Sequence, residues 1–416
     1  MDWGTVTAGT YFFWLKHCRI KRKEISCKMF KYQYWLREYI FRLLTRLPFP
    51  IKNFGITFFV KRKKKWLERL KTPAQLTLYV TNRCNARCSH CFYWQEVAGG
   101  RKKELSLSQI EKIARSLVDP LATLSITGGE PFLRNDLTQI CQVFCQCNRT
   151  RKINIVTNGF FTQEIRKTVE EILEKYPVDL NVQVSLDGLQ KTHDEIRKTS
   201  IFGRAIKTIK ALVDLSAKFK NFQVTVQTTV TRQNLDELLK LGKFIKERFP
   251  KVHHGFQFVR SASFDVYQIN KDLLSGLDPQ AKDPLLSTEE MEKALKDISQ
   301  FSDQKNSLLG SCVKIMNQDI IRMKKEKKPF VECLAGKYDA VIWPDGQVSM
   351  CEFAKPFANL KDYDFNFYKL WTSSKADKIR QKIKSCFCTH TCNLLNAMQF
   401  DKKVLLEVLG NKSQDE

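Results

Sequence analysis

The sequence predicts an α/β protein built on a parallel sheet, and three observations lead to this expectation. Between residues 75 and 260, six apolar runs rich in β-branched and aromatic residues alternate with stretches of helical periodicity. Turn-forming residues such as Gly and Asn follow several of these runs. With 416 residues, 43% of them hydrophobic, the chain is large enough for one main core and a smaller satellite domain.

The expected elements alternate regularly along the chain. Strands are expected at residues 76–80, 121–126, 153–156, 180–186, 222–230 and 256–259. Helices are expected between them, at residues 106–117, 136–147, 162–176, 202–218 and 234–249. Strands that alternate with helices pair in parallel through right-handed crossovers. Side chains at the carboxyl ends of such strands meet at one edge of the sheet, where we expect the chemistry to lie.

The first seventy residues form a basic extension. Residues 1–71 contain 18 Lys and Arg against 4 Asp and Glu, a balance of +14 out of a total of +26. Aromatic residues are interleaved with these bases, and Ile40, Leu43, Leu44 and Leu47 follow helical spacing. We expect a largely helical extension that lies on an anionic membrane surface, or else a basic helix packed on the core. Nucleic acid is the weaker expectation, because binding to phosphates needs no apolar stripe.

The cellular location follows from cysteine usage and hydropathy. Fourteen cysteines in a long chain without a signal-peptide pattern favour reduced thiols, some of them metal ligands. The apolar region at residues 39–60 is interrupted by Arg42, Arg46, Pro48, Pro50 and Lys52, which argues against a spanning helix. We therefore expect a cytoplasmic protein, peripheral to the inner face of the membrane.

A cysteine triplet follows the first expected strand. Cys84, Cys88 and Cys91 have C-x3-C-x2-C spacing, and three thiolates on a short loop can ligate three irons of a cubane while leaving the fourth iron open. Zinc is the alternative, but it usually needs four ligands, so His90 would have to complete the site from within a tight loop.

The triplet resembles that of the radical S-adenosylmethionine (SAM) superfamily, which has it after the first strand of a partial (β/α)6 barrel of the TIM type. The resemblance implies a [4Fe-4S] cluster on Cys84, Cys88 and Cys91, with SAM at the open iron. It also implies that His90 packs toward the adenine.

The second expected strand ends in Gly128, Gly129, Glu130 and Pro131. Taken alone, this is a turn. Two glycines allow a close approach of the backbone to a ligand, and a carboxylate can accept hydrogen bonds from an ammonium group. The resemblance implies that this Gly-Gly-Glu-Pro segment binds the amino group of SAM.

The fourth expected strand ends near Ser185 and Asp187, and Arg197 follows on a short polar segment. Alone, the aspartate is a turn former and the arginine part of a surface ion pair. The resemblance implies that the three residues bind the ribose and carboxylate of SAM, which suits an aspartate and an arginine fork. Thr228, Asn234 and Arg260, at the ends of strands five and six, are candidates for lining the substrate pocket.

A second cysteine group lies near the C-terminus. Cys333 and Cys351 flank a Pro-Asp-Gly turn that predicts a hairpin, and Cys386, Cys388 and Cys392 follow a helical stretch. This group resembles the SPASM domain, or its shorter twitch form, and implies an auxiliary [4Fe-4S] cluster. The expected ligands are Cys333, Cys351, Cys388 and Cys392, with Cys386 as a substitute; structural zinc is the alternative. Cys141, Cys145 and Cys147, at helical spacing, are expected in the core.

The expected organisation has five parts: the extension (1–70), the radical SAM barrel (71–265), a helical linker (266–330), the auxiliary cluster domain (331–400) and a tail (401–416). The expected enzyme reductively cleaves SAM, with electrons from flavodoxin or ferredoxin, to a 5′-deoxyadenosyl radical. This radical abstracts hydrogen from a peptide, sugar or lipid-linked substrate, and the auxiliary cluster assists oxidation or substrate binding. The alternatives are a non-catalytic iron-sulfur electron carrier and a zinc-stabilised membrane scaffold, neither of which needs the cofactor-binding set.

Overall fold

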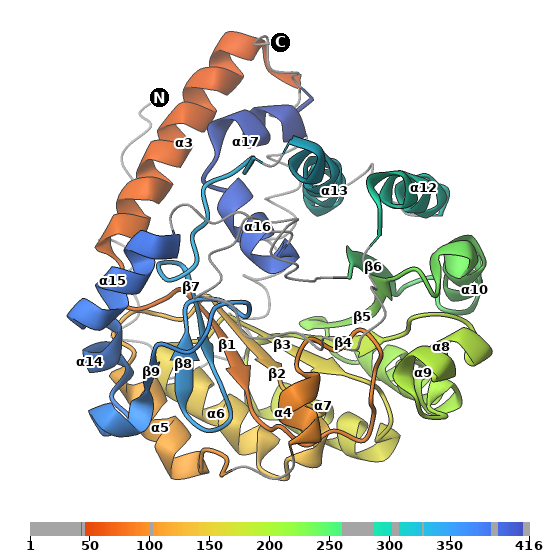
Figure 1. Ribbon diagram of the computed structural model, residues 1–416, viewed down its shortest axis with the longest axis horizontal. Helices are drawn as coiled ribbons and strands as arrows, with labels where there is room; N and C mark the ends of the chain where they lie inside the picture. Colours follow the sequence, from red (N-terminus) through yellow and green to blue (C-terminus); the bar gives the residue numbers. More distant parts are fainter. Residues whose placement is uncertain are drawn as a thin grey trace.

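A computed structural model of the chain describes residue 43 and residues 46–99, 103–259, 286–301, 308–326, 328–383 and 390–410. At its centre is one sheet of nine strands in the order β6-β5-β4-β3-β2-β1-β7-β8-β9 (Figure 1). The sheet does not close, because β6 and β9 are its two edges. The architecture is therefore a partial barrel.

The six predicted strands and the predicted parallel pairing are confirmed. The strands are β1 (Gln75–Tyr79), β2 (Thr123–Thr127), β3 (Lys152–Thr157), β4 (Asp179–Ser185), β5 (Phe222–Val230) and β6 (His253–Phe258). The five predicted helices are α5 (Leu107–Ser116), α6 (Leu137–Asn148), α7 (Thr162–Lys175), α9 (Phe202–Ser216) and α10 (Leu238–Arg248). Two short helices near the strand ends, α4 (Trp94–Ala98) and α8 (Gln190–Arg197), were not predicted.

The strands have an apolar face and a polar face. On β2, Leu124 and Ile126 are fully buried in the main core, while the alternating Thr123, Ser125 and Thr127 line a large cavity. The apolar face lies against helices such as α5 and α6. This alternation follows from the two-residue period of a strand, and it leaves the inside of the partial barrel polar. Cys141 is buried in the core, with Cys145 and Cys147 packed against it, as predicted.

The C-terminal module extends the sheet of the barrel. Its first strand, β7 (Asp339–Ile342), pairs in parallel with β1, and β8 (Gln347–Ser349) and β9 (Ala358–Asn359) extend the same sheet. The predicted hairpin turn joins β7 to β8, with Gly346 at φ 88°. Ile342 and Val348 share the main core with the barrel strands. Helices α14 (Phe367–Trp371) and α15 (Ser374–Ile383) follow.

The remaining helices gather on one side of the barrel (Figure 1). They are α3 (Phe49–Arg69), α12 (Thr288–Ser299), α13 (Leu308–Glu326), α16 (Thr391–Met398) and α17 (Lys402–Val408). The helix predicted from Ser287 begins there, because Ser287 and Glu290 form a reciprocal capping box. Among the described residues, no helix has the length and apolar character that crossing a membrane requires.

Candidate active site

The polar face of the barrel borders a cavity of about 1520 Å³. The loop after β1 covers one end of the cavity, and α13 and the C-terminal module contribute further walls. Nine of the predicted site residues of the barrel line this single cavity: Cys84, Cys88, His90, Cys91, Gly128, Gly129, Glu130, Ser185 and Arg197. Pro131 is buried behind it in a single 3-10 turn.

The loop that carries the three cysteines is bound on two sides. The N–H groups of Gly129 and Glu130 donate to the carbonyls of Thr81 and Arg83, each at 2.8 Å. On the other side, the N–H of Ser89 donates to the carbonyl of Ile196 in α8 at 2.9 Å. The loop is therefore held between the end of β2 and helix α8, which follows β4.

The two glycines let this loop approach. A Cβ at Gly128 would lie 2.4 Å from the Thr81 carbonyl oxygen, and Gly128 has φ 137°. A Cβ at Gly129 would lie 2.1 Å from the Arg83 carbonyl oxygen. The glycines thus have a structural purpose that the sequence did not reveal, because they make room for the cysteine loop. Their predicted contact with the cofactor stays a prediction.

Burial makes two thiols of the triplet hard to ionise. Burial raises the pKa of Cys84 to about 11 and that of Cys91 to about 12. The free thiols would therefore stay protonated and unreactive at neutral pH, whereas metal coordination deprotonates such groups. Among the described residues, no three His, Cys, Asp or Glu side chains gather as ligands of one metal ion.

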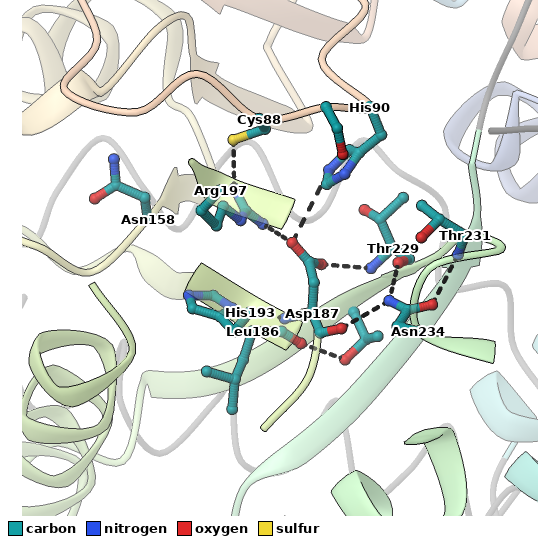
Figure 2. Close-up of polar contacts among 12 residues, drawn as sticks. Cys88, His90, Asn158, Leu186, Asp187, His193, Arg197, Thr229, Thr231 and Asn234 are labelled. Carbon is teal, nitrogen blue, oxygen red and sulfur yellow. Dashed lines mark hydrogen bonds and ion pairs between the residues drawn. The ribbon is translucent and has the colours of Figure 1, made fainter. Parts of the chain in front are cut away.

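Arg197 connects the cysteine loop to β4. Its guanidinium donates to Cys88 Sγ at 3.4 Å and pairs with Asp187 Oδ2 at 2.5 Å (Figure 2). His90 Nε2 lies 4.0 Å from the same carboxylate oxygen. Burial opposes ionisation of Asp187, but Arg197 and the two nearby histidines outweigh it, so its pKa is lowered.

Asp187 lies beneath the cavity and does not line it. Its side chain is fully buried, and its second oxygen accepts the N–H of Thr229 at 2.9 Å. The N–H of Asp187 donates to His193 Nδ1 at 3.0 Å, which assigns the proton of that neutral ring to Nε2. The predicted contact of Asp187 with SAM stays a prediction, and the geometry favours a role in positioning Arg197.

Two of the three substrate-pocket candidates belong to this supporting layer instead. The side chain of Asn234 donates to the carbonyl of Asp187 at 2.7 Å and to that of Thr229 at 2.8 Å (Figure 2). Thr228 Oγ1 donates to the carbonyl of Leu186 at 2.6 Å. Both side chains are buried and fix the end of β4, so neither lines the cavity. Arg260 lies outside the described residues.

Glu130 ties the ends of β2 and β3 together. Its oxygens accept hydrogen bonds from Thr157 Oγ1 and from the N–H of Asn158, both at 2.8 Å, and from the N–H of Phe132 at 3.2 Å. Burial raises the pKa of Glu130 to about 7. A carboxylate has about four acceptor positions, so one is left for the predicted ammonium group.

Unsatisfied polar atoms beside the cysteines fit a polar cofactor. His90 Nδ1, Trp94 Nε1 and Arg197 Nε are buried without a hydrogen-bond partner, and all three residues line the cavity. Buried donors and acceptors normally find partners, so these atoms indicate a bound polar molecule. Trp94 had not been singled out from the sequence, because one tryptophan after a cysteine carries no pattern. The residues present therefore fit a [4Fe-4S] cluster with SAM.

The second cysteine group is only partly described. Cys333 and Cys351 are partly buried against the main core, while Cys392, at the start of α16, is exposed and lines the same cavity as the first group. Cys386 and Cys388 lie outside the described residues, so the predicted ligand set stays a prediction. The position of Cys392 places part of the second group on the wall of the candidate active site.

A buried hydrogen-bonded chain joins the two cysteine groups. Tyr79, at the end of β1, donates to Glu352 Oε1 at 2.7 Å, and Glu352 Oε2 lies 2.5 Å from His390 Nε2. Glu352 follows Cys351 and lines the cavity. Sequence reasoning missed these residues, because they come from three distant segments that only the pairing of β7 with β1 brings together.

Comparisons with known proteins define the class. Residues 78–245 match the family model described as the radical SAM superfamily, and residues 333–393 match that of the SPASM iron-sulfur cluster-binding domain. The chain thus contains a radical SAM domain followed by a SPASM domain, which confirms the predicted resemblance. Its cofactors are those of the two domains: a [4Fe-4S] cluster with SAM, and an auxiliary iron-sulfur centre.

Individual relatives are more distant. The chain is 26% identical over 322 residues to the antilisterial bacteriocin subtilosin biosynthesis protein AlbA of Bacillus subtilis, covering 76% of this chain and 64% of AlbA. It is 33% identical over 146 residues to GTP 3′,8-cyclase of Actinobacillus pleuropneumoniae, covering 34% of this chain and 41% of the cyclase. The chain thus spans less than two thirds of either relative.

Among solved structures, the fold is similar to Streptococcus suis SuiB bound to precursor peptide SuiA. The TM-score is 0.53 at 17% identity, over 83% of this chain and 75% of SuiB.

Proposed function

We propose that the protein modifies a peptide by radical chemistry in the cavity beneath the cysteine loop. A [4Fe-4S] cluster on Cys84, Cys88 and Cys91, with SAM at its open iron, would supply a 5′-deoxyadenosyl radical that abstracts hydrogen from carbon. The residues around it hold the loop, orient Arg197 and enclose the reaction. Flavodoxin or ferredoxin is the proposed source of electrons.

The single observation that carries the peptide assignment is a row of neutral polar side chains across the cavity. Adjacent strands β1 to β5 place these residues in direct register, and all of them line the cavity: Thr77, Ser125, Asn154, Asn181 and Gln223. We call them the polar row. At about 3.3 Å per residue, Thr77 lies roughly 13 Å along the chain before Thr81, where the cysteine loop begins.

The chemistry of the polar row matches a peptide main chain. A carboxamide both donates and accepts, as a peptide group does, and Asn154 Oδ1 is buried without a partner. Thr225 Oγ1 already donates to Asn181 Oδ1 at 2.9 Å, which leaves the amide N–H groups of Asn181 for a ligand. Such a row can bind the main chain of a peptide irrespective of the peptide's side chains. The reacting carbon would then lie nearer the cysteines.

A nucleotide substrate is the rival that the second relative suggests. A triphosphate is usually bound by Arg, Lys or a helix N-terminus, and the polar row contains no cation. Five other Lys and Arg line the cavity: Arg197 pairs with Asp187 and Arg232 with Glu290 at 2.9 Å, while Arg87, Lys152 and Lys198 lie outside the polar row. The printed names of AlbA and SuiB, a bacteriocin biosynthesis protein and a partner of a precursor peptide, also support a peptide.

The second cysteine group supports an oxidation of the substrate. Loss of one hydrogen atom from the substrate leaves a carbon radical, and a closed-shell oxidised product also requires loss of one electron and one proton. Cys392 lines the cavity, so an auxiliary iron-sulfur centre that it ligated would be near enough to accept that electron. We therefore propose an oxidative modification, in which the peptide loses two hydrogen atoms.

The experiment uses anaerobically reconstituted full-length enzyme with SAM and dithionite. It is mixed in parallel with a randomised synthetic peptide library and with GTP, and the products are followed by mass spectrometry. We expect 5′-deoxyadenosine together with peptides that have lost two hydrogens, and no consumption of GTP. If GTP is converted while the peptides keep their masses, the substrate is a nucleotide and the peptide proposal is wrong.

Two variants separate the roles of the cavity. Asn154→Leu removes a central carboxamide of the polar row. It should lower the amount of peptide product at least tenfold, because main-chain groups of the bound peptide would then be buried without a hydrogen-bond partner. The slow release of 5′-deoxyadenosine without peptide should not change. Gln163→Leu on the exposed side of α7 is the matched control and should behave as the wild type. Absence of 5′-deoxyadenosine from the wild type would favour the electron carrier or the zinc scaffold instead.

The predicted association with an anionic membrane is a separate proposal, because it depends on α3 and not on the cavity.

A further inference from the structure

Helix α3 has two apolar faces. One face packs on the C-terminal helix α17, where Ile56 and Val60 form a small core with Leu409. The opposite face carries Ile51, Phe54 and Phe58, which are 55%, 77% and 56% exposed. In a helix these three residues lie on one side, because their spacings of three and four residues match its period.

This exposure is concentrated in one place. Nine large hydrophobic residues are exposed in the described part of the chain, and eight of them lie between residues 43 and 66. The other is Val118, on the barrel. Scattered single exposures are ordinary, but a contiguous exposed group on one element marks an interaction surface.

The same face turns from apolar to basic along the helix. One turn beyond Phe58, Arg62 and Lys65 continue the exposed side, and Arg62 lies over the Phe58 ring at 5.6 Å. Within its 21 residues, α3 contains seven Lys and Arg and a single acid, Glu68. We call Ile51, Phe54, Phe58, Arg62 and Lys65 the α3 outer face.

We propose that the α3 outer face docks on an anionic lipid bilayer. A helix that lies in a bilayer interface inserts rings and aliphatic side chains to the acyl boundary while its bases meet the headgroups. The face is the convex side of a single helix about 30 Å long, which suits a lipid surface better than it suits a peptide. No residue of α3 lines the cavity, so docking leaves the candidate active site accessible.

Charge argues against the other occupants. A second copy of the same face would bring Arg62 and Lys65 against their own counterparts in a parallel pair, or against Ile51 and Phe54 in an antiparallel pair, with no acid on the face to neutralise them. Nucleic acid would be attracted by the bases, but it gains nothing from Phe54 at 77% exposure. An anionic bilayer can bind both the apolar residues of the face, in its acyl region, and the basic residues, at its headgroups.

The experiment is flotation of the full-length protein with phosphatidylcholine vesicles, with and without phosphatidylglycerol. We expect recovery with the anionic vesicles, and weaker recovery as salt rises. Phe54→Ser combined with Phe58→Ser should lower the partition coefficient at least tenfold, because two rings no longer enter the lipid. Arg62→Gln combined with Lys65→Gln should lower it on anionic vesicles only, by roughly fivefold for each base.

Matched controls lie on the barrel. Val118→Ser removes the one exposed large hydrophobic that the described residues have outside positions 43–66, and Lys240→Gln combined with Lys243→Gln removes the same charge from exposed positions of α10. Both should float as the wild type does. Phe54→Trp, which keeps an interfacial aromatic ring, should also bind normally. Thermal unfolding and sedimentation of each variant check its folding and its oligomeric state.

Three outcomes would overturn the proposal. Wild-type protein that stays unbound with anionic vesicles removes the membrane as the partner. Binding that persists in the Phe54→Ser, Phe58→Ser variant assigns the membrane contact to another segment. A wild-type dimer that this variant converts to a monomer assigns the face to a second copy of the chain.

Discussion

The two cysteine groups share one type of ligand but differ in how the fold supports them. The first group lies on a loop held by the end of β2 and by helix α8, and backed by the fully buried Asp187. The second combines the partly buried Cys333 and Cys351 with the exposed Cys392. A site that generates a reactive radical needs a fixed geometry, whereas a site that accepts an electron tolerates more variation. The difference indicates that positioning is concentrated at the first group.

The largest expected effect separates the two groups directly. Cys88→Ala should abolish 5′-deoxyadenosine formation, because the open-iron cluster loses a ligand. Cys392→Ala should keep this reaction while lowering the iron content by about half, because only the auxiliary centre is lost. Iron analysis and quantification of 5′-deoxyadenosine check both variants. Loss of 5′-deoxyadenosine in both would contradict the division of roles.

The second prediction compares the buried ion pair of the barrel with the hydrogen-bonded chain of the module. Arg197→Leu leaves Asp187 buried without its cation, so we expect a loss of about 3–5 kcal/mol in the free energy of unfolding. Glu352→Gln keeps an acceptor for Tyr79 and should cost about 1 kcal/mol. Urea unfolding under anaerobic conditions measures both. Equal losses would mean that the two regions are held equally firmly.

The third prediction uses one glycine from each region. Gly128→Ala places a Cβ against the Thr81 backbone at a positive φ, so we expect a loss of about 3 kcal/mol in unfolding free energy and weaker cluster loading. Gly336→Ala is also at positive φ, 79°, but its nearest contact is the flexible Met350 side chain at 2.8 Å. There we expect about 1 kcal/mol and normal loading. Iron content and urea unfolding are measured for both variants. Equal losses of stability and iron in the two would contradict the prediction.

That the residues around the first cysteine group line one cavity could be predicted from a rule of parallel sheets. Strand carboxyl ends meet at one edge, so Cys88, Gly128 and Arg197 were expected to converge although they are far apart in the chain. The same rule did not indicate that Asp187 lies beneath the cavity, or that Asn234 supports it. Both are short polar residues after strands, and their direction depends on packing that no local pattern encodes.

The module was less predictable for a topological reason. Its hairpin was expected, because a Pro-Asp-Gly turn acts locally, but the pairing of β7 with β1 joins segments with a long chain between them. The Tyr79–Glu352–His390 contacts depend on that pairing, so they were missed as well. The polar row was missed for a related reason: its residues align only once the strand order and register are fixed.

The last prediction concerns His254 on β6 and the stability of the barrel in acid. Burial lowers the pKa of His254 to about 3, and its Nε2 lies 2.8 Å from Thr228 Oγ1. The unfolded chain binds a proton below pH 6.5 while the folded ring stays neutral, so this histidine lowers stability as the pH falls from 6.5 toward 3. Between pH 6.5 and pH 5 the loss should be about 2 kcal/mol.

His254→Gln keeps a polar partner for Thr228 and removes the titration, so urea unfolding of this variant should depend less on pH than that of the wild type. Glu352→Gln in the module should leave the contribution of His254 unchanged, because His254 belongs to β6 at the opposite side of the sheet. If His254→Gln and the wild type lose stability in parallel on acidification, another group limits the acid stability of the barrel. In that case His254 can be protonated in the folded barrel without loss of the fold, unlike the buried groups around the cysteine loop.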